Sequence, residues 1–225
     1  EKRAVVEAAE SAGAREVYLI EETMAAAYGA EMSCVNESTG GMVVDIGGGT
    51  TGISVISLGG IVHSRSIKTA GDSLNNAIVD YVRRTYNVLI GENMAESVKQ
   101  SVADVRETPS ESLKMSIRGR NLETGLPKSL TLTANDTKKA LEESILEIIN
   151  VIREALDVTP PELAGDIMVD GIVLAGGGAL LGGLSERISK ATQLKVTVAD
   201  EPLLCVVRGC GKALEEINTL RRISI

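Results

Sequence analysis

Aromatic residues are scarce in this sequence, and acidic residues outnumber basic ones. It has no tryptophan and no phenylalanine, and four tyrosines are the only bulky aromatic residues among 225. Proteins that bind single-stranded nucleic acids stack bases on aromatic side chains, so that platform is missing here. The net charge is −8, which leaves no overall basic surface for a phosphate backbone. We therefore expect no nucleic-acid partner and a core built from aliphatic residues and methionine.

Long apolar runs and paired cysteines are absent as well. The sequence contains no run of about 18 apolar residues and so predicts no transmembrane helix. Cys34, Cys205 and Cys210 lack CxxC spacing, which argues against a disulfide framework or a zinc site and favours a reducing cytosol. What the sequence does have is 44 % hydrophobic and 24 % charged residues. This balance is typical of a globular chain with one large or two small domains.

Helical and strand-like periodicities alternate along the chain, which predicts an α/β fold. Alternating apolar residues around glycine turns predict a three-stranded meander over residues 42–67. Leucine and isoleucine spacing predicts a long helix from about Asp136 to Leu156, with Thr133 and Asp136 as a capping box. Further helices are expected over 1–12, 22–29, 72–86 and 93–101, after Pro161, from Leu180 and over 203–219, and further strands over 17–20, 113–117, 129–133, 171–175 and 194–198.

The first glycine-rich loop, Asp45-Ile46-Gly47-Gly48-Gly49-Thr50-Thr51-Gly52, follows an apolar strand. It matches GxGxxG, but a dinucleotide-binding loop requires a helix next, and an alternating strand follows instead. The GxxxxGKS/T pattern of a P-loop is absent. Backbone N–H groups in such a hairpin can surround phosphates, and Asp45 can hold a hydrated magnesium ion. The alternative is a tight hairpin with a purely structural role.

A second glycine-rich loop, Leu174-Ala175-Gly176-Gly177-Gly178-Ala179-Leu180-Leu181, also follows an apolar strand, and a helix is predicted after it. A ligand can bind at the N-terminal end of such a helix. The alternative is that the glycines only allow close packing of helix on strand. Together, the two loops indicate a bipartite nucleotide site.

Two such loops in one α/β chain resemble the pattern of the actin-like ATPase superfamily, which includes actins, DnaK-type chaperones and sugar kinases. Asp45–Thr51 resembles its second phosphate loop, and Leu174–Leu181 resembles its adenosine loop. Leu19–Ala27 resembles the connecting motif that carries the catalytic carboxylate.

More specific motifs resemble the MreB family of bacterial actin homologues. They are Val43–Thr51, Arg83–Asn87, Gly119–Leu122 with Gly125–Lys128, and Pro160–Ala164 with Asp166–Ile167. The resemblance covers essentially the whole chain and implies an actin-like (ribonuclease H-like) ATPase lobe with a small α+β insert subdomain. One departure is Thr23, where the family usually has proline.

The resemblance also implies a set of site residues for ATP and Mg²⁺. Glu22 would be the catalytic carboxylate that orients the attacking water, with Glu21 as the alternative, and Asp45 would hold the metal through water. The implied nucleotide-binding residues are Gly48, Gly49 and Thr50 for the phosphates, Glu96, Ser97, Val98 and Lys99 for the ribose and adenine, and Gly177, Gly178, Ala179 and Leu180 for the adenosine.

The family's first phosphate loop, an Asp-x-Gly-Thr turn, has no counterpart in the sequence, which also does not begin with methionine. We therefore expect an N-terminally truncated chain that alone binds ATP weakly and has negligible turnover. The expected division is residues 1–24 from the first lobe, 25–71 with 135–200 as the nucleotide-binding α/β subdomain of the second lobe, 72–134 as the small insert, and 201–225 as a C-terminal helix returning to the first lobe.

The function implied by the resemblance is that of a cytoskeletal ATPase. Its subunits would polymerise head to tail into filaments that guide cell-wall synthesis and determine bacterial cell shape. The implied partners are further copies of the protein, cell-wall morphogenesis proteins and the membrane surface, reached through the first lobe, so the protein would be cytoplasmic and peripheral to the inner membrane. The alternative is a soluble kinase or chaperone-type ATPase of the same superfamily, which shares both loops; the MreB-like insert favours the filament.

Overall fold

The computed structural model describes residues 2–215. Its larger sheet has five strands in the order β3–β2–β1–β7–β8. β1 is antiparallel to β2, and β2 to β3, whereas β1, β7 and β8 run parallel. The strands are β1 (Gly41–Ile46), β2 (Thr51–Ser57), β3 (Gly60–Ile67), β7 (Ile172–Ala175) and β8 (Val196–Val198). The predicted meander and the predicted α/β class are therefore confirmed.

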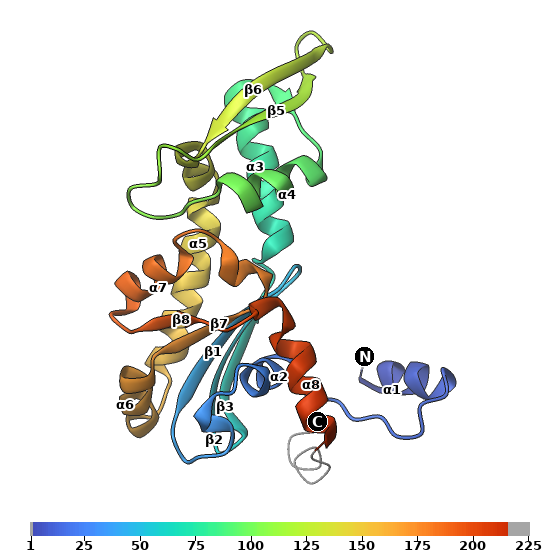
Figure 1. Cartoon of the computed structure of the whole chain (residues 1–225), viewed down its shortest axis with the longest axis vertical. Coiled ribbons are helices and arrows are strands. Elements are labelled where there is room, and N and C mark those ends of the chain that lie inside the picture. Colours follow the sequence, from blue (N-terminus) through green and yellow to red (C-terminus); the bar gives the residue numbers. More distant parts are fainter. Residues whose placement is uncertain (1, 216–225) are drawn as a thin grey trace.

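Both faces of this sheet are covered by helices, so every residue of β1 is buried. Met42, Val44 and Ile46 face the main core, whereas Val43 packs on the other side with Met24. The main-core face is covered by α5 (Ala134–Asp157), α6 (Pro161–Asp170) and α7 (Leu184–Thr192), and the opposite face by α2 (Glu22–Gly29) and α8 (Cys205–Glu215) (Figure 1).

A second, three-stranded sheet lies at the far end of the long axis (Figure 1). Its order is β4–β5–β6, all antiparallel. It comprises β4 (Val88–Leu89), β5 (Lys114–Asn121) and β6 (Pro127–Thr133), and it packs with α3 (Gly71–Tyr86) and α4 (Glu92–Val102). The predicted cap of α5 is confirmed, because Thr133 N donates to the Asp136 carboxylate and Asp136 N to Thr133 Oγ1.

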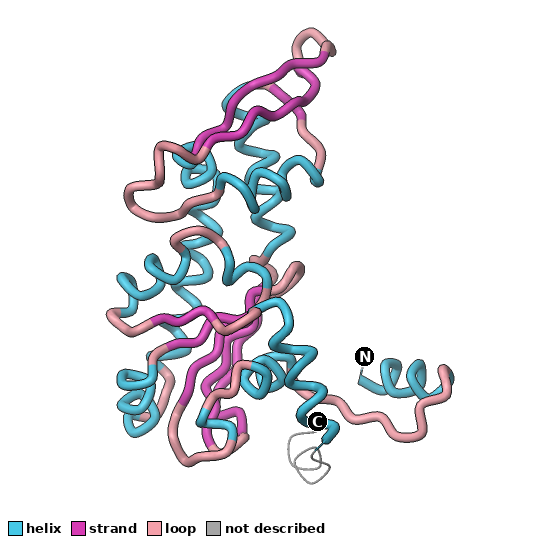
Figure 2. The backbone as a smooth tube through the Cα atoms, viewed as in Figure 1, coloured by secondary structure: helices cyan, strands magenta, loops and turns pink. Residues whose placement is uncertain are grey.

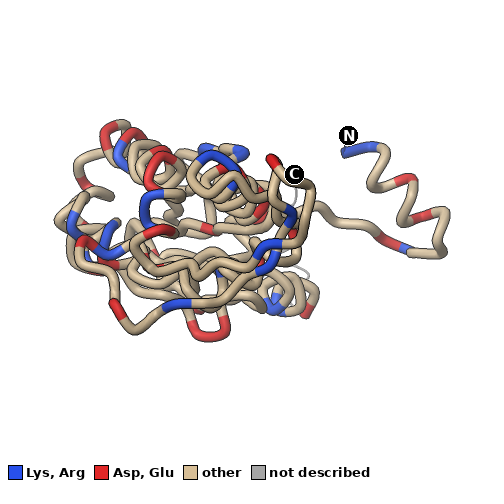
Figure 3. The backbone as a smooth tube through the Cα atoms, turned by 90° about the horizontal axis from the view of Figure 1, so that it is seen from above, with Lys and Arg blue, Asp and Glu red and all other residues tan. Residues whose placement is uncertain are grey.

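The N-terminal helix α1 (Lys2–Ser11) stands apart from the body, at the end of a loop (Figures 2 and 3). None of its residues is buried. Residues 12–20 lead from it to α2. Short 3₁₀ helices η1 (Ser33–Val35), η2 (Gly177–Leu180) and η3 (Pro202–Leu204) complete the described elements. None of the described helices combines the length and apolarity needed to cross a membrane.

Three expected elements differ in the structure. Val17–Ile20 was expected as a strand, but only Ile20 forms an isolated β-bridge, and the segment is half-buried and belongs to neither described sheet. The helix expected from Leu180 begins only at Leu184, because residues 177–180 form a 3₁₀ turn and Gly183 adopts φ +78°. The final helix is described only to Glu215; the rest of the expected 203–219 helix, and of the 201–225 segment, lies outside the described residues.

Candidate functional site

A cavity of about 730 Å³ lies where both glycine loops meet. It opens at the carboxyl ends of the parallel strands β1 and β7, the position at which open α/β sheets bind ligands. Its walls come from the start of α2, the β1–β2 loop, the start of α3, α4, η2, and η3 with α8. The lining residues are Glu22, Asp45, Gly47, Gly48, Gly71, Asp72, Leu74, Glu96, Lys99, Gln100, Gly176, Gly177, Gly178, Leu180, Leu181, Pro202, Leu203 and Val206.

The first glycine loop is a tight turn tied to the start of α3. Gly47 N donates to Thr50 O at 3.0 Å, and Gly71 N donates to Gly47 O at 3.0 Å. Asp72 N donates to Gly48 O at 2.8 Å. A side chain at Gly71 would place its Cβ 3.2 Å from Gly47 O, so the start of α3 packs closely against the turn. Gly48 lines the cavity, whereas the exposed Gly49 and Thr50 stand at the tip of the turn and are not among the lining residues.

Asp45 sits beneath this turn with its carboxylate unsatisfied. The residue is 4 % exposed, and Oδ1 is buried without a hydrogen-bond partner. Burial, followed by the charge of Glu22, raises the pKa of Asp45 to about 6. A buried carboxylate oxygen without a partner is costly unless a cation or donor compensates it.

Asp45 therefore fits a hydrated Mg²⁺, which takes few protein carboxylates and keeps its waters and phosphate oxygens. Within residues 2–215, no group of three or more His, Cys, Asp or Glu side chains is arranged to hold a metal ion. A metal here would thus depend on a bound phosphate for much of its coordination.

Glu22 is the first residue of α2 and lines the cavity, whereas Glu21 precedes the helix and does not. The next residue, Thr23, is buried, and its Oγ1 lies 2.7 Å from Ser54 Oγ in a hydrogen bond. The Thr23 methyl group also packs against Gly52, where a Cβ would lie 2.7 Å away. Threonine at this position thus ties the start of α2 to β2.

Helix α4 presents one face to the cavity, formed by Glu96, Lys99 and Gln100. Lys99 Nζ lies 2.8 Å from the Glu96 carboxylate and donates to Gly71 O at 3.0 Å, so it links α4 to the start of α3. Hydrogen bonds from Lys99, then from Asn75, lower the pKa of Glu96. The site therefore holds a fixed cation beside the first glycine loop.

Two α4 residues from the expected set do not line the cavity. Ser97 is exposed and donates to Asn93 O, and Val98 is fully buried in the core. Helical geometry explains this, because Lys99 and Gln100 follow Glu96 by three and four residues and share its face, whereas Ser97 and Val98 follow it by one and two and do not.

The second glycine loop packs tightly on the end of β1. Gly176 has φ +78°, and a Cβ there would lie 2.4 Å from Ile46 O. A Cβ at Gly178 would lie 2.2 Å from Ile46 Cγ2. Gly177, Gly178 and Leu180 nevertheless line the cavity, so the glycines serve close packing and also leave backbone facing the cavity. Ala179 is buried and does not line it.

The sequence interpretation missed several lining residues. Asp72 had an available signal, since it follows Gly71 at the first turn of a predicted helix. Gln100 is four residues after Glu96 and so shares its helix face. Leu203 and Val206 carry no local signal, because only the tertiary fold brings η3 and α8 to the cavity rim.

Comparison with known proteins shows which family the sequence resembles throughout its length. The sequence matches the MreB/Mbl protein family over residues 1–222. It is 50 % identical over 219 residues to the cell shape-determining protein MreB of Escherichia coli (strain K12), covering 97 % of this chain and 62 % of that protein. It is 44 % identical to the cell shape-determining protein Mbl of Bacillus subtilis (strain 168), covering 98 % and 66 %. The chain thus spans less than two thirds of these relatives.

Solved structures share the fold. The crystal structure of MreB 5 of Spiroplasma citri bound to AMPPNP superimposes with a TM-score of 0.93 at 36 % identity, over 99 % of this chain and 66 % of that one. The MamK double helical filament matches with a TM-score of 0.79 at 24 % identity, over 96 % and 64 %, and supports the fold alone. The predicted actin-like fold is confirmed.

Proposed function

Because this chain belongs to the MreB/Mbl protein family, we propose that its cavity binds ATP with Mg²⁺ and that the protein is an actin-like cytoskeletal ATPase. The observation that carries the proposal is the convergence of two distant glycine loops, an unsatisfied buried Asp45 and a fixed Lys99 on one cavity. The MreB 5 relative with AMPPNP bound, at 36 % identity, supports it.

The phosphates would lie against Gly48, Gly49 and Thr50, where the exposed turn offers backbone N–H groups. The ribose and adenine would lie between α4 and η2, against Glu96 and Lys99 on one side and Gly177, Gly178 and Leu180 on the other. Ser97, Val98 and Ala179 would act by shaping these walls.

Glu22 would accept a hydrogen bond from the attacking water and orient it toward the γ-phosphate. Phosphoryl transfer depends largely on such positioning and on charge stabilisation. Bound Mg²⁺ would neutralise charge that develops on the phosphate oxygens. Asp45 would hold that ion through water, with its unpartnered Oδ1 accepting the hydrogen bond.

At the level of the cell, we propose head-to-tail filaments that guide cell-wall synthesis and determine cell shape. The E. coli and B. subtilis relatives carry that description, cell shape-determining, in their names. The proposed partners are further copies of the protein, cell-wall morphogenesis proteins and the inner surface of the cytoplasmic membrane. The proposed units are residues 25–71 with 135–200 around the larger sheet and residues 72–134 around the smaller one.

The test is sedimentation, with and without ATP and Mg²⁺, of a purified protein that carries both lobes. We expect ATP-dependent pelleting that depends steeply on protein concentration, and its loss in an Asp45→Ala variant. Monomers at all concentrations, with ADP released only when a sugar is added, would instead identify a kinase. The 225-residue chain by itself is expected to bind ATP weakly, and calorimetry that gives a micromolar Kd would overturn that part.

A further inference from the structure

Two opposite walls of the cavity are joined just behind it. The chain leaving α4 and the chain leaving η2 lie side by side, with a parallel bridge between Asp104 and Gly182. Val105 N donates to Gly182 O at 2.8 Å. We call these residues, Asp104–Arg106 with Gly182–Gly183, the wall junction.

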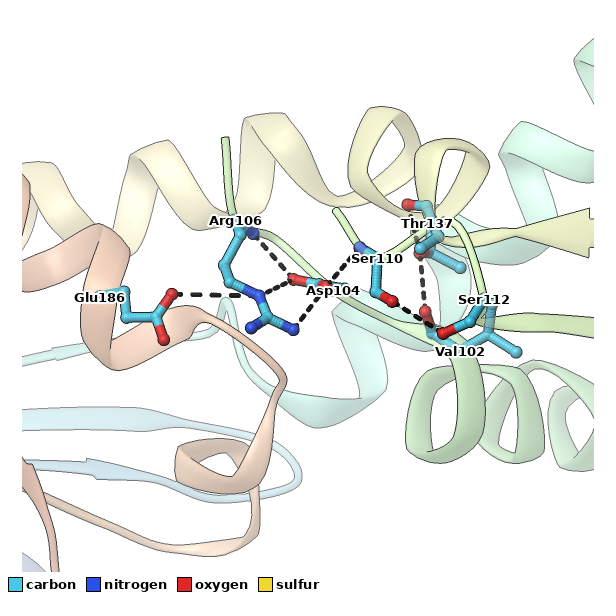
Figure 4. A network of polar contacts seen from close by, with 8 residues as sticks. Val102, Asp104, Arg106, Ser110, Ser112, Thr137 and Glu186 are labelled. Carbon is cyan, nitrogen blue, oxygen red and sulfur yellow. Dashed lines mark hydrogen bonds and ion pairs between the residues drawn. The ribbon is translucent and has the colours of Figure 1, made fainter. Parts of the chain in front are cut away.

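Asp104 is the buried centre of the wall junction (Figure 4). Its side chain is fully buried and accepts four hydrogen bonds. Arg106 donates from Nε at 2.9 Å, from Nη2 at 2.8 Å and from its backbone N at 3.1 Å, and Ser110 N donates at 2.9 Å. These bonds, those from Arg106 foremost, lower the pKa of Asp104. The carboxylate therefore fixes the turn that follows α4.

The opposing segment is shaped to receive this turn. A Cβ at Gly182 would lie 2.7 Å from Ala103 O, and one at Gly183 would lie 2.4 Å from Arg106 Cγ. On the far side, Arg187 of α7 donates to Val105 O at 3.1 Å. Any larger residue at either glycine would push the two walls apart.

The phosphate end of the cavity is anchored separately, through the hydrogen bonds that Gly71 N and Asp72 N make to Gly47 O and Gly48 O. We propose that Asp104 and Arg106 are positioning residues for the base and ribose end of the nucleotide, because they set the separation between α4 and η2. This inference rests on the proposed ATP site and adds the residues that determine its adenosine affinity.

The binding test uses calorimetry at millimolar ligand concentrations with ATP, AMP and tripolyphosphate. The Arg106 side chain is half-exposed, so its removal should be tolerated. We expect Arg106→Ala and Asp104→Asn each to weaken the binding of ATP and of AMP by the same factor, about tenfold, or about 1.4 kcal/mol. Tripolyphosphate should change by less than about twofold. Lys190→Ala is the matched control, because its exposed ion pair joins α7 to Glu107, directly after the wall junction, and its loss should leave all three affinities unchanged.

Hydrogen exchange without nucleotide supplies a measurement that does not depend on the ATP site. In Arg106→Ala, residues 99–103 and 177–183 should exchange faster together, while residues 47–52 keep the wild-type rate. The inference is overturned if the affinities for ATP, AMP and tripolyphosphate fall equally, or if the hydrogen-exchange rate of residues 177–183 does not change. If the wild-type chain binds no nucleotide, but hydrogen exchange in Arg106→Ala changes as expected, the proposed ATP-binding function is overturned. The adenosine role of Asp104 and Arg106 is then overturned with it.

Discussion

Two buried aspartates should respond to pH in opposite directions when each is replaced by asparagine. Asp45 has an oxygen without a partner and a pKa raised from 3.8 to about 6, mainly by burial. Asp104 accepts four hydrogen bonds, and its pKa is lowered. Asp45→Asn and Asp104→Asn are therefore a matched pair: both replace a carboxylate by an amide, but the pKa of one carboxyl is raised and that of the other is lowered.

The sign for Asp45 follows from its raised pKa. Its contribution to stability is present below pH 4 and is lost as the pH rises through 6, because the folded chain then holds a poorly solvated charge. At 1.36 kcal/mol per pKa unit, ionised Asp45 costs about 3 kcal/mol at pH 8 and about 0.5 kcal/mol at pH 4. The free energy of unfolding of Asp45→Asn, measured relative to wild type, should therefore be about 2 kcal/mol higher at pH 8 than at pH 4.

The contribution of Asp104 to stability depends on pH in the opposite direction. Its contribution is present above its unfolded pKa and is lost as the pH falls through its lowered folded pKa. Asp104→Asn should destabilise the chain by roughly 2 kcal/mol at pH 8, because hydrogen bonds to a charged acceptor are lost, and by less at pH 4.

The assay is urea unfolding followed by far-UV circular dichroism at both pH values, in buffer with EDTA and without nucleotide. The asparagine amide adds a cost that does not depend on pH. The diagnostic quantity is therefore the change, between pH 4 and pH 8, in each variant's free energy of unfolding relative to wild type. A pH-independent difference for Asp45→Asn, or the same slope for both variants, would refute the assignment of an unsatisfied carboxylate at Asp45.

Two further predictions concern catalysis and packing. In a protein that carries both lobes, and therefore the first phosphate loop, Glu22→Gln should reduce phosphate release from ATP by at least about 100-fold while ATP affinity changes less than about threefold, because a positioned carboxylate acts on the attacking water; equal losses in both would contradict a catalytic role. Gly178→Ala should lower the free energy of unfolding by about 1–3 kcal/mol, since its Cβ would meet Ile46 Cγ2 at 2.2 Å. Gly165→Ala in α6, with open space around it, is the control and should be neutral or stabilise the chain by up to about 1 kcal/mol in the same melts.

Much of the fold could be predicted because its signals are local. Local neighbours in the chain produce the apolar run of β1, the period-two pattern of β2, the turn glycines between β2 and β3, and the Thr133–Asp136 cap. Val17–Ile20 shows the limit, because an apolar run has the same local pattern whether it forms a full sheet strand or, as here, only a single bridge at Ile20. The start of α7 was misplaced because residues 177–180 satisfy a 3₁₀ turn as readily as an α-helix.

The candidate site was predictable to the extent that motifs follow helix geometry. Transfer of a whole motif placed Ser97 and Val98 in the site, although one helix face can offer only Glu96, Lys99 and Gln100. Leu203 and the wall junction arise from tertiary contacts between distant segments. No local pattern in the sequence encodes which segments will meet.

The parallel pairing of β1 with β7 has a consequence for how the chain is made. Val43 pairs with Val173, so this edge of β1 stays open while the intervening residues emerge from the ribosome. At about 5–20 residues per second, that interval is roughly 6–26 s. The meander can form early, but an apolar strand edge is then exposed to other nascent chains. The nucleotide cavity closes only after this wait, because its second glycine loop follows β7 directly.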